Sequence, residues 1–418
     1  MTPEKPPHPP ILPLQGHLQH YAWGRHGSES LVARYASAQG AIPGGVLVNE
    51  CYAELWLGAH PSGEALAVLP DGRRVGCSQL APGAPLPFLL KVLSVRQALS
   101  LQVHPDRERA AVLHAARPDV YRDANHKPEM AVCIGDEPFE ALCGFRSAAD
   151  IRQALAAVPE LRELAGAAAA EEFMRAPSGE ESAALRPLFT GLMRNEALAP
   201  ALAKSLLQRL SSEATAEKLT VADSLFMRLH TQFPGDVGVF APYLLHYVQL
   251  QPGEALYMGP NEPHAYLSGH CVEVMACSDN VVRAGLTPKP KDIDTLCDML
   301  QYVCRDAFPR VLRDARQVYR TPAEEFALQE VQLVRERDGE GYQAVERCVG
   351  VSMWLCVEGD GWLQGREGNA WGNEWLLAPG MTYWVGKGVC LRLRAVSPRF
   401  LAYRAHAKGA LKEEQRVS

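Results

Sequence analysis

The chain has 418 residues, of which 47% are hydrophobic, and it carries a formal net charge of −6 at pH 7. This length and apolar content predict two or three domains with well-filled cores. The acidic balance gives no overall attraction for nucleic acid or acidic membranes, so an anionic substrate would need a local cluster of cations. No apolar run reaches the roughly 18 residues of a membrane-spanning helix, and the start of the chain lacks a signal-peptide pattern. We therefore expect a cytoplasmic enzyme.

The 11 cysteines are scattered through the chain, and no C-x-x-C pair suggests a structural zinc site. We interpret them as reduced and mostly buried thiols, because free cysteine commonly fills protein cores. No neighbouring residue marks any of them as a catalytic nucleophile.

The spacing of apolar residues changes along the chain. Short apolar runs separated by Gly and Pro predict strands over residues 1–146, and apolar residues at spacings of three and four predict helices over residues 147–239. Strand-like runs return over residues 240–316, with one or two helices after Thr287, and continue over residues 317–418. We therefore predict a mainly β protein in which residues 1–146 and 240–316 form one domain, residues 147–239 an α-helical insertion, and residues 317–418 a second β domain.

Four side chains with metal-binding groups occur in three short segments. Gln102 and His104 are two residues apart, so in a strand they would point from the same face into one pocket. Glu129 stands at the entrance of an apolar strand, and His264 follows a turn, a short strand and a second turn. Each segment alone has an ordinary explanation, such as a solvated pair, a turn glutamate or a loop histidine.

The segment that ends in His264 is the most specific of the three. It has the pattern P-G-x5-G-x4-H, which Gly253, Gly259 and His264 fill. This pattern resembles the second sequence motif of cupins, small β-barrels that hold a metal ion with residues from adjacent strands. The resemblance implies a cupin-type jelly-roll barrel for the first domain, and we predict a cupin-like fold for the C-terminal domain, residues 317–418, as well.

Together the candidates supply two imidazoles, one carboxylate and one amide oxygen, with no thiolate. Structural zinc sites are closed and rich in cysteine, whereas nitrogen and oxygen ligands with room for water or substrate are typical of catalytic zinc. The set therefore predicts a catalytic zinc site.

Seven segments, in the same order, look like those of type I phosphomannose isomerases. They are Gln19–Gly24, Ala53–Pro61, Pro87–Ser94, the segment with Gln102 and His104, His126–Met130, Pro263–Tyr266 and Cys277–Thr287. This resemblance implies a zinc-dependent isomerase that interconverts mannose 6-phosphate and fructose 6-phosphate and acts as a monomer with one zinc ion. Carried over residue by residue, it implies that zinc is held by Gln102, His104, Glu129 and His264.

The resemblance also implies that Arg283 is catalytic. A guanidinium suits this role because it is always charged and can stabilise negative charge that develops on an enediol-like intermediate. Binding models for the family place Lys91, Ser100 and Lys289 near the substrate phosphate, and Lys127 is a further cation that we expect to face the site.

The proton carrier stays open at this point. Lys127, Glu273, Asp279 or a zinc-bound water could move a proton between C2 and C1 of the sugar. A zinc-assisted hydride shift, which needs no such base, is the alternative mechanism.

Two other functions compete with the isomerase hypothesis. A cupin dioxygenase would favour more histidine ligands than this set, and Gln102 argues against it. A non-catalytic sugar-phosphate sensor would be expected to have lost the ligands or Arg283.

The C-terminal domain has no histidine at the ligand position of Gly380–Gly388, so we predict no metal site there. The pathway stays open, because nucleotide-sugar synthesis and the breakdown of mannose use the same reaction in opposite directions.

Overall fold

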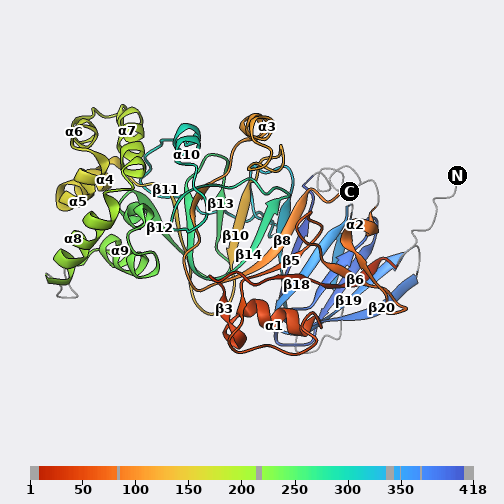
Figure 1. Ribbon diagram of the computed structural model, residues 1–418. Helices are drawn as coiled ribbons and strands as arrows, with labels where there is room; N and C mark the ends of the chain where they lie inside the picture. Colours follow the sequence, from red (N-terminus) through yellow and green to blue (C-terminus); the bar gives the residue numbers. More distant parts are fainter. Residues whose placement is uncertain are drawn as a thin grey trace.

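The computed structural model describes residues 9–81, 85–212, 219–335, 343–348, 350–367 and 370–408. The outer ends of the first and last predicted domains, residues 1–8 and 409–418, lie outside the described residues. Figure 1 shows three units in a row, with helices at one end, a barrel in the middle and the C-terminal sheets at the other end. Within the described residues, no helix is long and apolar enough to cross a membrane.

The central unit is a ten-stranded antiparallel sheet system that forms the barrel in the middle of Figure 1. Its strands are β2 (His17–Gln19), β5 (Glu54–Leu57), β8 (Phe88–Val95), β9 (Leu101–Val103), β10 (Glu129–Cys133), β11 (Phe139–Phe145), β12 (Leu245–Leu250), β13 (Ala255–Met258), β14 (His264–Ala276) and β15 (Val282–Gly285). Six of them run in the order β12-β11-β14-β8-β5-β2, while β10 pairs with β13 and β14 and β9 pairs with β14 and β15. Every residue of β8 is buried, because both faces of this strand are covered.

Strand β14 joins the two halves of the barrel. Residues 269–276 pair with β8, whereas residues 264–268 pair with β11. The change of partner falls at Gly269, whose φ of 103° is a conformation that favours glycine. A Cβ atom at this position would lie 2.8 Å from the Cα atom of Phe139, so space as well as backbone angle excludes a side chain.

The helical unit lies between β11 and β12 in the sequence. It consists of α4 (Ala148–Ala157), α5 (Pro159–Ala165), α6 (Ala167–Arg175), α7 (Glu181–Arg194), α8 (Ala199–Ser212), α9 (Val221–Gln232) and the 3-10 helix η2 (Val237–Tyr243). Apolar residues three and four apart face its core; on α7, Leu185, Leu188 and Leu192 are fully buried. Helix α9 begins with a capping box between Thr220 and Asp223. Helices α4 to α9 lie within the predicted residues 147–239, whereas η2 runs on to Tyr243, and the domain boundaries themselves stay a prediction.

Two sheets form the C-terminal unit. The seven-stranded sheet contains, in spatial order, β16 (Ala327–Val334), β23 (Arg399–His406), β18 (Ser352–Glu358), β21 (Thr382–Val385), β1 (Ile11–Gln15), β6 (Leu66–Val68) and β7 (Arg74–Gly76). The four-stranded sheet contains β17 (Gln343–Arg347), β22 (Cys390–Ala395), β19 (Gly361–Glu367) and β20 (Ala370–Leu377).

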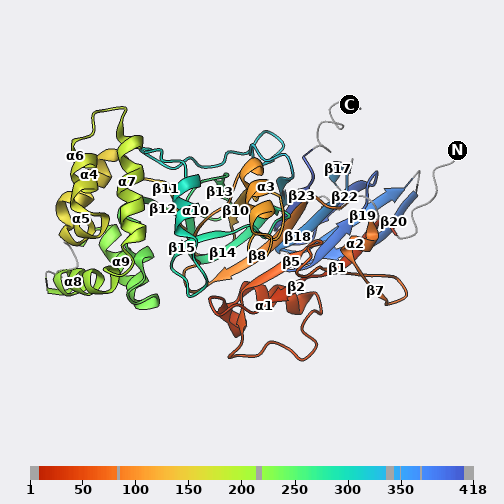
Figure 2. The ribbon, with the colours of Figure 1, turned by 45° about the horizontal axis from the view of Figure 1, so that its top comes forward.

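The strands β1, β6 and β7 come from the first predicted domain but belong to the C-terminal sheet. Figure 2 shows β1 among the C-terminal strands. It pairs with β21, with Ile11 opposite Val385 and Leu14 opposite Thr382. The predicted division of the chain did not anticipate this pairing. Local sequence patterns show that a strand forms but not which distant strand it meets.

One apolar core joins the barrel to the C-terminal sheet. Leu90 and Met130 of the barrel belong to the same buried cluster as Phe326 and Leu355. Shorter elements complete the chain: β3 (Arg25–His26), η1 (Gly27–Glu29), α1 (Leu31–Ala38), β4 (Cys51–Tyr52), α2 (Cys77–Leu80), α3 (Arg107–Ala116) and α10 (Ile293–Met299). Because the core is shared, the C-terminal sheet supports the barrel directly.

Candidate metal centre and active site

The predicted ligands lie on neighbouring strands of the barrel. Gln102 is on β9, and His104 follows the end of this strand by one residue. Glu129 is the first residue of β10 and His264 the first residue of β14. Gln102 and His264 are partners across the strand pair, so backbone pairing fixes their separation.

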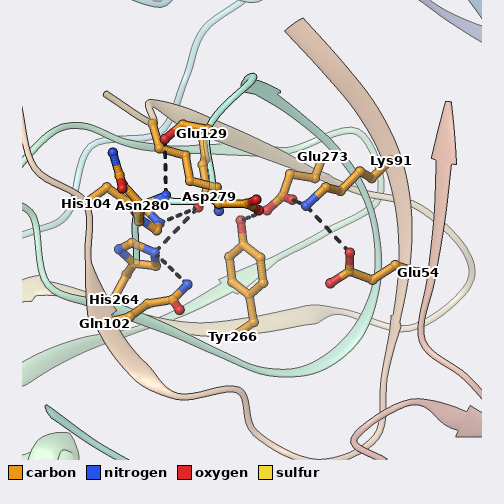
Figure 3. Close-up of polar contacts among 12 residues, drawn as sticks. Glu54, Lys91, Gln102, His104, Glu129, His264, Tyr266, Glu273, Asp279 and Asn280 are labelled. Atoms are coloured by element: carbon orange, nitrogen blue, oxygen red, sulfur yellow. Dashed lines mark hydrogen bonds and ion pairs between the residues drawn. The ribbon is translucent and has the colours of Figure 1, made fainter. Parts of the chain in front are cut away.

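Three of these side chains converge on one point (Figure 3). The Nε2 atoms of His104 and His264 lie 3.1 Å and 3.6 Å from Oε2 of Glu129. One potential ligand atom from each residue lies within 4.8 Å of the other two, and all three residues are buried. The structure thus brings together three residues that are far apart in the sequence.

Gln102 lies beside this cluster. Its Oε1 accepts a hydrogen bond from Ser100 Oγ at 3.1 Å, and its Nε2 lies 3.3 Å from Nε2 of His264. A half turn of the amide about its terminal bond would exchange the two atoms and present an oxygen to the cluster. Gln102 can therefore supply a fourth, neutral oxygen ligand.

Backbone carbonyl groups orient both imidazoles. Nδ1 of His104 lies 2.7 Å from the carbonyl oxygen of Asn280, and Nδ1 of His264 lies 3.0 Å from that of Glu262. Because a carbonyl can only accept, each Nδ1 carries a proton, so Nε2 is the nitrogen with the free lone pair when the ring is neutral. This is the arrangement that metal-binding histidines require.

The ionisation states also suit a metal ion. Burial lowers the pKa of His104 to about 4, although the charge of Glu129 opposes this shift, so the imidazole is neutral at pH 7. Burial opposes the charge of Glu129 itself, but Lys127 and the neighbouring His104 outweigh burial and hold its pKa well below the usual range. Two imidazoles, a carboxylate and an amide oxygen form a nitrogen-and-oxygen donor set that fits catalytic zinc.

A cavity of about 400 Å³ opens beside the cluster. The catalytic and substrate-binding residues predicted from the sequence all line it, namely Lys91, Ser100, Lys127, Arg283 and Lys289. Gln102 and Glu129 line the same cavity. The walls also contain Trp56, Tyr266 and Phe233, the last of which follows helix α9 of the helical unit.

The two cations at one side of the cavity have no carboxylate partner among the described residues. Neither Arg283 nor Lys289 forms an ion pair there, and the ammonium of Lys289 lies 5.3 Å from the ring centre of Tyr21. Burial and the nearby charge of Arg283 lower the pKa of Lys289. Burial also lowers the pKa of Arg283, a guanidinium that nevertheless stays charged at pH 7. Two cations that line one cavity and have no carboxylate partner among the described residues favour an anionic ligand.

The remaining predicted lysines are already paired. Lys91 is buried between Glu54 and Glu273, at 3.5 Å and 3.3 Å. The Nζ atom of Lys127 lies 2.5 Å from Oε1 of Glu129. These two lysines therefore neutralise carboxylates of the site, and less of their charge is available for a substrate phosphate than that of Lys289.

Several residues of the site had no assigned role in the sequence. Glu54 holds Lys91 and accepts from the indole of Trp56 at 2.5 Å, and Tyr266 donates to Oε1 of Glu273 at 2.8 Å. Glu54 and Tyr266 both fall inside segments that the family resemblance picked out. Burial, followed by the charge of Glu129, raises the pKa of Glu273, which is typical of functional carboxyl groups.

A buried His-Glu-His cluster in a β-barrel, beside a cavity that contains Arg283 and Lys289, is the arrangement expected of a metal-dependent enzyme that acts on an anionic substrate. Comparisons with known proteins agree. The family model for the catalytic domain of type I phosphomannose isomerase matches residues 11–148, and that for the helical insertion domain of the same family matches residues 162–245.

Curated relatives match over most of the chain. Mannose-6-phosphate isomerase 1 of Arabidopsis thaliana is 40% identical over 372 residues, covering 83% of this chain and 84% of that protein. Mannose-6-phosphate isomerase of Schizosaccharomyces pombe is 36% identical over 419 residues, covering 94% and 98%. The chain therefore belongs to the type I phosphomannose isomerase family.

Solved structures give the same result. A crystal structure of a mutant phosphomannose isomerase from Salmonella typhimurium matches with a TM-score of 0.77 at 26% identity, covering 96% of this chain and 100% of that one. A zinc-bound mannose 6-phosphate isomerase matches with a TM-score of 0.74 at 27% identity and the same coverage. The predicted family and the predicted fold class, a mainly β cupin-like protein with a helical insertion, are confirmed.

Proposed function

We propose that the protein is a mannose-6-phosphate isomerase, which interconverts D-mannose 6-phosphate and D-fructose 6-phosphate. The observation that carries this proposal is that Glu129, which forms the buried cluster with His104 and His264, lines the same cavity as Arg283 and Lys289, two cations without an ion pair among the described residues. The cluster fits a metal ion and the cations fit a phosphate. The names of the relatives, over most of their lengths, support the same substrate pair.

The metal in this proposal is one zinc ion per chain, held by Gln102, His104, Glu129 and His264. Zinc would supply Lewis-acid polarisation of the substrate's oxygen atoms, which makes the proton at C2 easier to remove. The zinc-bound relative and the donor set of the cluster support this choice of metal.

The chain's own residues would bind the substrate at its two ends. Lys289 and Ser100 would hold the phosphate, and Arg283 would stabilise negative charge that develops on the sugar oxygens during enediol formation. Lys127 would keep Glu129 ionised, and Lys91 would set the charge of Glu273 rather than carry the phosphate, because both lysines are already paired.

Glu273 is the best candidate for the base. It lies on the cavity, and its raised pKa makes it a stronger base than an ordinary glutamate. In the direction from mannose 6-phosphate, it would take the proton from C2 while the C2–H electron pair forms the C1–C2 double bond and the π pair of the C1 carbonyl moves onto O1. The O2 proton would then pass to O1, and as the O2 electron pair forms the C2 carbonyl, the C1–C2 π pair would take the proton back from Glu273 at C1. Lys127 is less suited because its ammonium already contacts Glu129. Asp279 is the alternative, and it accepts from Ser62 Oγ at 3.1 Å.

The proposal is tested by a coupled assay for fructose 6-phosphate together with metal analysis. We expect isomerisation that stops after treatment with a chelator and returns with zinc. The purified protein should carry one zinc ion per chain. A zinc-loaded protein without isomerase activity would refute the assignment.

The reaction in heavy water separates proton transfer from a hydride shift. Deuterium at C1 of fructose 6-phosphate supports transfer through a base, and loss of deuterium incorporation in Glu273→Gln but not in Asp279→Asn would assign the base to Glu273. Product without any deuterium would favour the hydride shift.

We further propose that the chain acts as a monomer on a small sugar phosphate in the cytoplasm, without nucleic acid or membrane partners. The net charge of −6 supports the absence of polyanionic partners. Light scattering during size-exclusion chromatography tests the monomer, and a mass of twice the chain's 45.8 kDa would contradict it.

A further inference from the structure

One carboxylate from the C-terminal side of the chain contacts both segments that carry the proposed metal ligands. Glu325 is 9% exposed and lies two residues before β16. Its Oε1 lies 2.7 Å from Nη2 of Arg107 and 2.5 Å from Nε2 of His126. Arg107 follows His104 by three residues, and His126 precedes Glu129 by three residues. The carboxylate therefore bridges the chain just after one ligand and just before another.

Further hydrogen bonds connect Arg107 and His126 to the proposed metal site. Arg107 Nη2 also lies 2.9 Å from the His126 ring nitrogen, and Arg107 Nη1 donates to the side chain of Asn125 at 3.3 Å. The carbonyl oxygen of Asn125 accepts from Nδ2 of Asn280 at 2.8 Å. The carbonyl of Asn280 is the group that orients the imidazole of His104, at 2.7 Å. An unbroken series of polar contacts thus runs from the bridging carboxylate to a ligand.

The C-terminal unit holds Glu325 in place. The next residue, Phe326, is completely buried in the core shared by the barrel and the C-terminal sheet. Lys408, which follows strand β23, donates to the carbonyl oxygens of Thr321 and Ala323 at 2.7 Å and 2.9 Å. Burial opposes the charge of Glu325, but the hydrogen bond from His126 and the nearby guanidinium of Arg107 outweigh it and lower its pKa. The carboxylate is therefore ionised and anchored.

We propose that Glu325 is a positioning residue of the metal site, which fixes the separation of the segments that carry His104 and Glu129. This inference rests on the proposed zinc site. Its consequence is that a residue from the C-terminal side of the chain, beyond helix α10, sets part of the affinity for zinc. Within the described residues, the ion pairs of Glu325 include no proposed ligand, and Glu325 does not line the cavity.

Zinc affinity measured against a chromophoric chelator tests the proposal on the full chain. Loss of a group that contacts a ligand directly typically weakens metal binding 10- to 100-fold, and Glu325 acts through intermediate residues, so we expect Glu325→Ala to weaken zinc binding about three- to tenfold. Glu325→Gln should weaken it less, because its amide oxygen still accepts from one partner.

Glu160→Gln is the matched control. Glu160 is 7% exposed and pairs with Arg209 at 2.8 Å, but it lies on helix α5 of the helical unit. The zinc affinity of the Glu160→Gln variant should equal that of the wild type. Because Arg107 is largely exposed, Arg107→Ala provides a second variant that should fold, and it should weaken zinc binding in the same direction.

Two further readouts distinguish positioning from general damage. At saturating zinc, Glu325→Ala should regain nearly the wild-type kcat, because the catalytic groups are intact. In the metal-free protein, hydrogen exchange should accelerate in residues 104–107 and 123–129 but not in the helical unit.

Zinc affinity within twofold of the wild type in both Glu325→Ala and Arg107→Ala would overturn the positioning role. Failure of the wild-type chain to bind zinc would instead refute the proposed metal site, so the two failures are separate results. If Glu325→Ala does not fold, Glu325→Gln and Arg107→Ala decide the question by the same measurement.

Discussion

Arg283 on β15 lies directly opposite Gln102 on β9 in the antiparallel pair. The proposed charge-stabilising group and a proposed metal ligand are thus joined by backbone pairing rather than by a flexible loop. This arrangement would hold the guanidinium beside the proposed metal ligands before substrate arrives.

Removal of the guanidinium should therefore reduce the rate without emptying the metal site. We expect Arg283→Ala to lower kcat/KM by about 100- to 1,000-fold, the range found when one charge-stabilising donor is lost. Arg283→Lys should recover only part of this loss, because an ammonium lacks the planar fork. Steady-state kinetics and metal analysis check the result, and loss of zinc together with activity would contradict it.

Lys289 should act mainly in substrate binding. We expect Lys289→Ala to raise KM by about tenfold, equivalent to about 1.4 kcal/mol, while kcat changes little. Inhibition by inorganic phosphate should weaken to a similar extent. Lys291→Ala is the control, because Lys291 pairs with Asp236 at 3.4 Å and lies outside the cavity lining. An unchanged KM in Lys289→Ala would remove this residue from the phosphate site.

The buried triad of Glu54, Lys91 and Glu273 should be sensitive to loss of its cation. Lys91→Met leaves two carboxylates without their common partner, and we expect it to lower the free energy of unfolding by about 3–5 kcal/mol. Urea unfolding measures this change. Lys291→Met, which removes a lysine from a more exposed ion pair, should cost about 1 kcal/mol or less. Equal costs for the two variants would mean that the triad has no special role in stability.

The raised pKa of Glu273 predicts opposite pH effects on activity and stability. If Glu273 is the base, kcat should rise with pH, because the carboxyl must lose its proton to react. The midpoint of this rise should lie above the ordinary glutamate pKa of 4.5. For stability the sign is reversed, since a carboxyl with a raised folded-state pKa contributes fully below 4.5 and loses its contribution as pH rises through the raised pKa.

A pH series of kcat and of urea unfolding, for the wild type and Glu273→Gln, checks both signs. The difference in unfolding free energy between the two proteins should grow in favour of Glu273→Gln as pH rises. A rise in kcat with its midpoint at or below pH 4.5 would exclude Glu273 as the base.

Gly269 should not tolerate a side chain. Its φ is positive, and a Cβ atom would come within 2.8 Å of Phe139, so we expect Gly269→Ala to lower the free energy of unfolding by about 1–3 kcal/mol. The matched control is Gly72→Ala, because Gly72 also has a positive φ but has open space around it. Thermal unfolding of both variants separates the cost of the backbone angle from that of the close contact. Equal losses in the two variants would mean that the contact with Phe139 costs nothing.

The sequence predicted the chemistry of the site better than its supporting contacts. The spacing of Gln102 and His104 and the turn pattern before His264 are local signals, so they could be recognised without a structure. Their convergence with Glu129 agrees with the predicted set, while their roles as zinc ligands stay a prediction. By contrast, the pairing of Lys91 with Glu54 and Glu273 depends on strand register, which local patterns do not reveal.

The same limit applied to the fold. Periodicity located the helical insertion because amphipathic helices repeat within a few residues. It could not place β1 in the C-terminal sheet, since the partner of Ile11 is Val385. It also could not reveal that Glu325 contacts Arg107, a residue on the far side of the helical insertion in sequence.

Strand β14 contains one extra residue relative to β11, and this changes which of its side chains share a face. Tyr266 and Glu273 are seven residues apart, and in a regular strand an odd separation places two side chains on opposite faces. Here the hydroxyl of Tyr266 nevertheless donates to Glu273, because the register of β14 against β11 shifts between Tyr266 and Ser268. Because of the extra residue, side chains before and after it that are an odd number of residues apart point to the same face. A single strand thereby brings the proposed ligand His264 and the proposed base Glu273 to the same site.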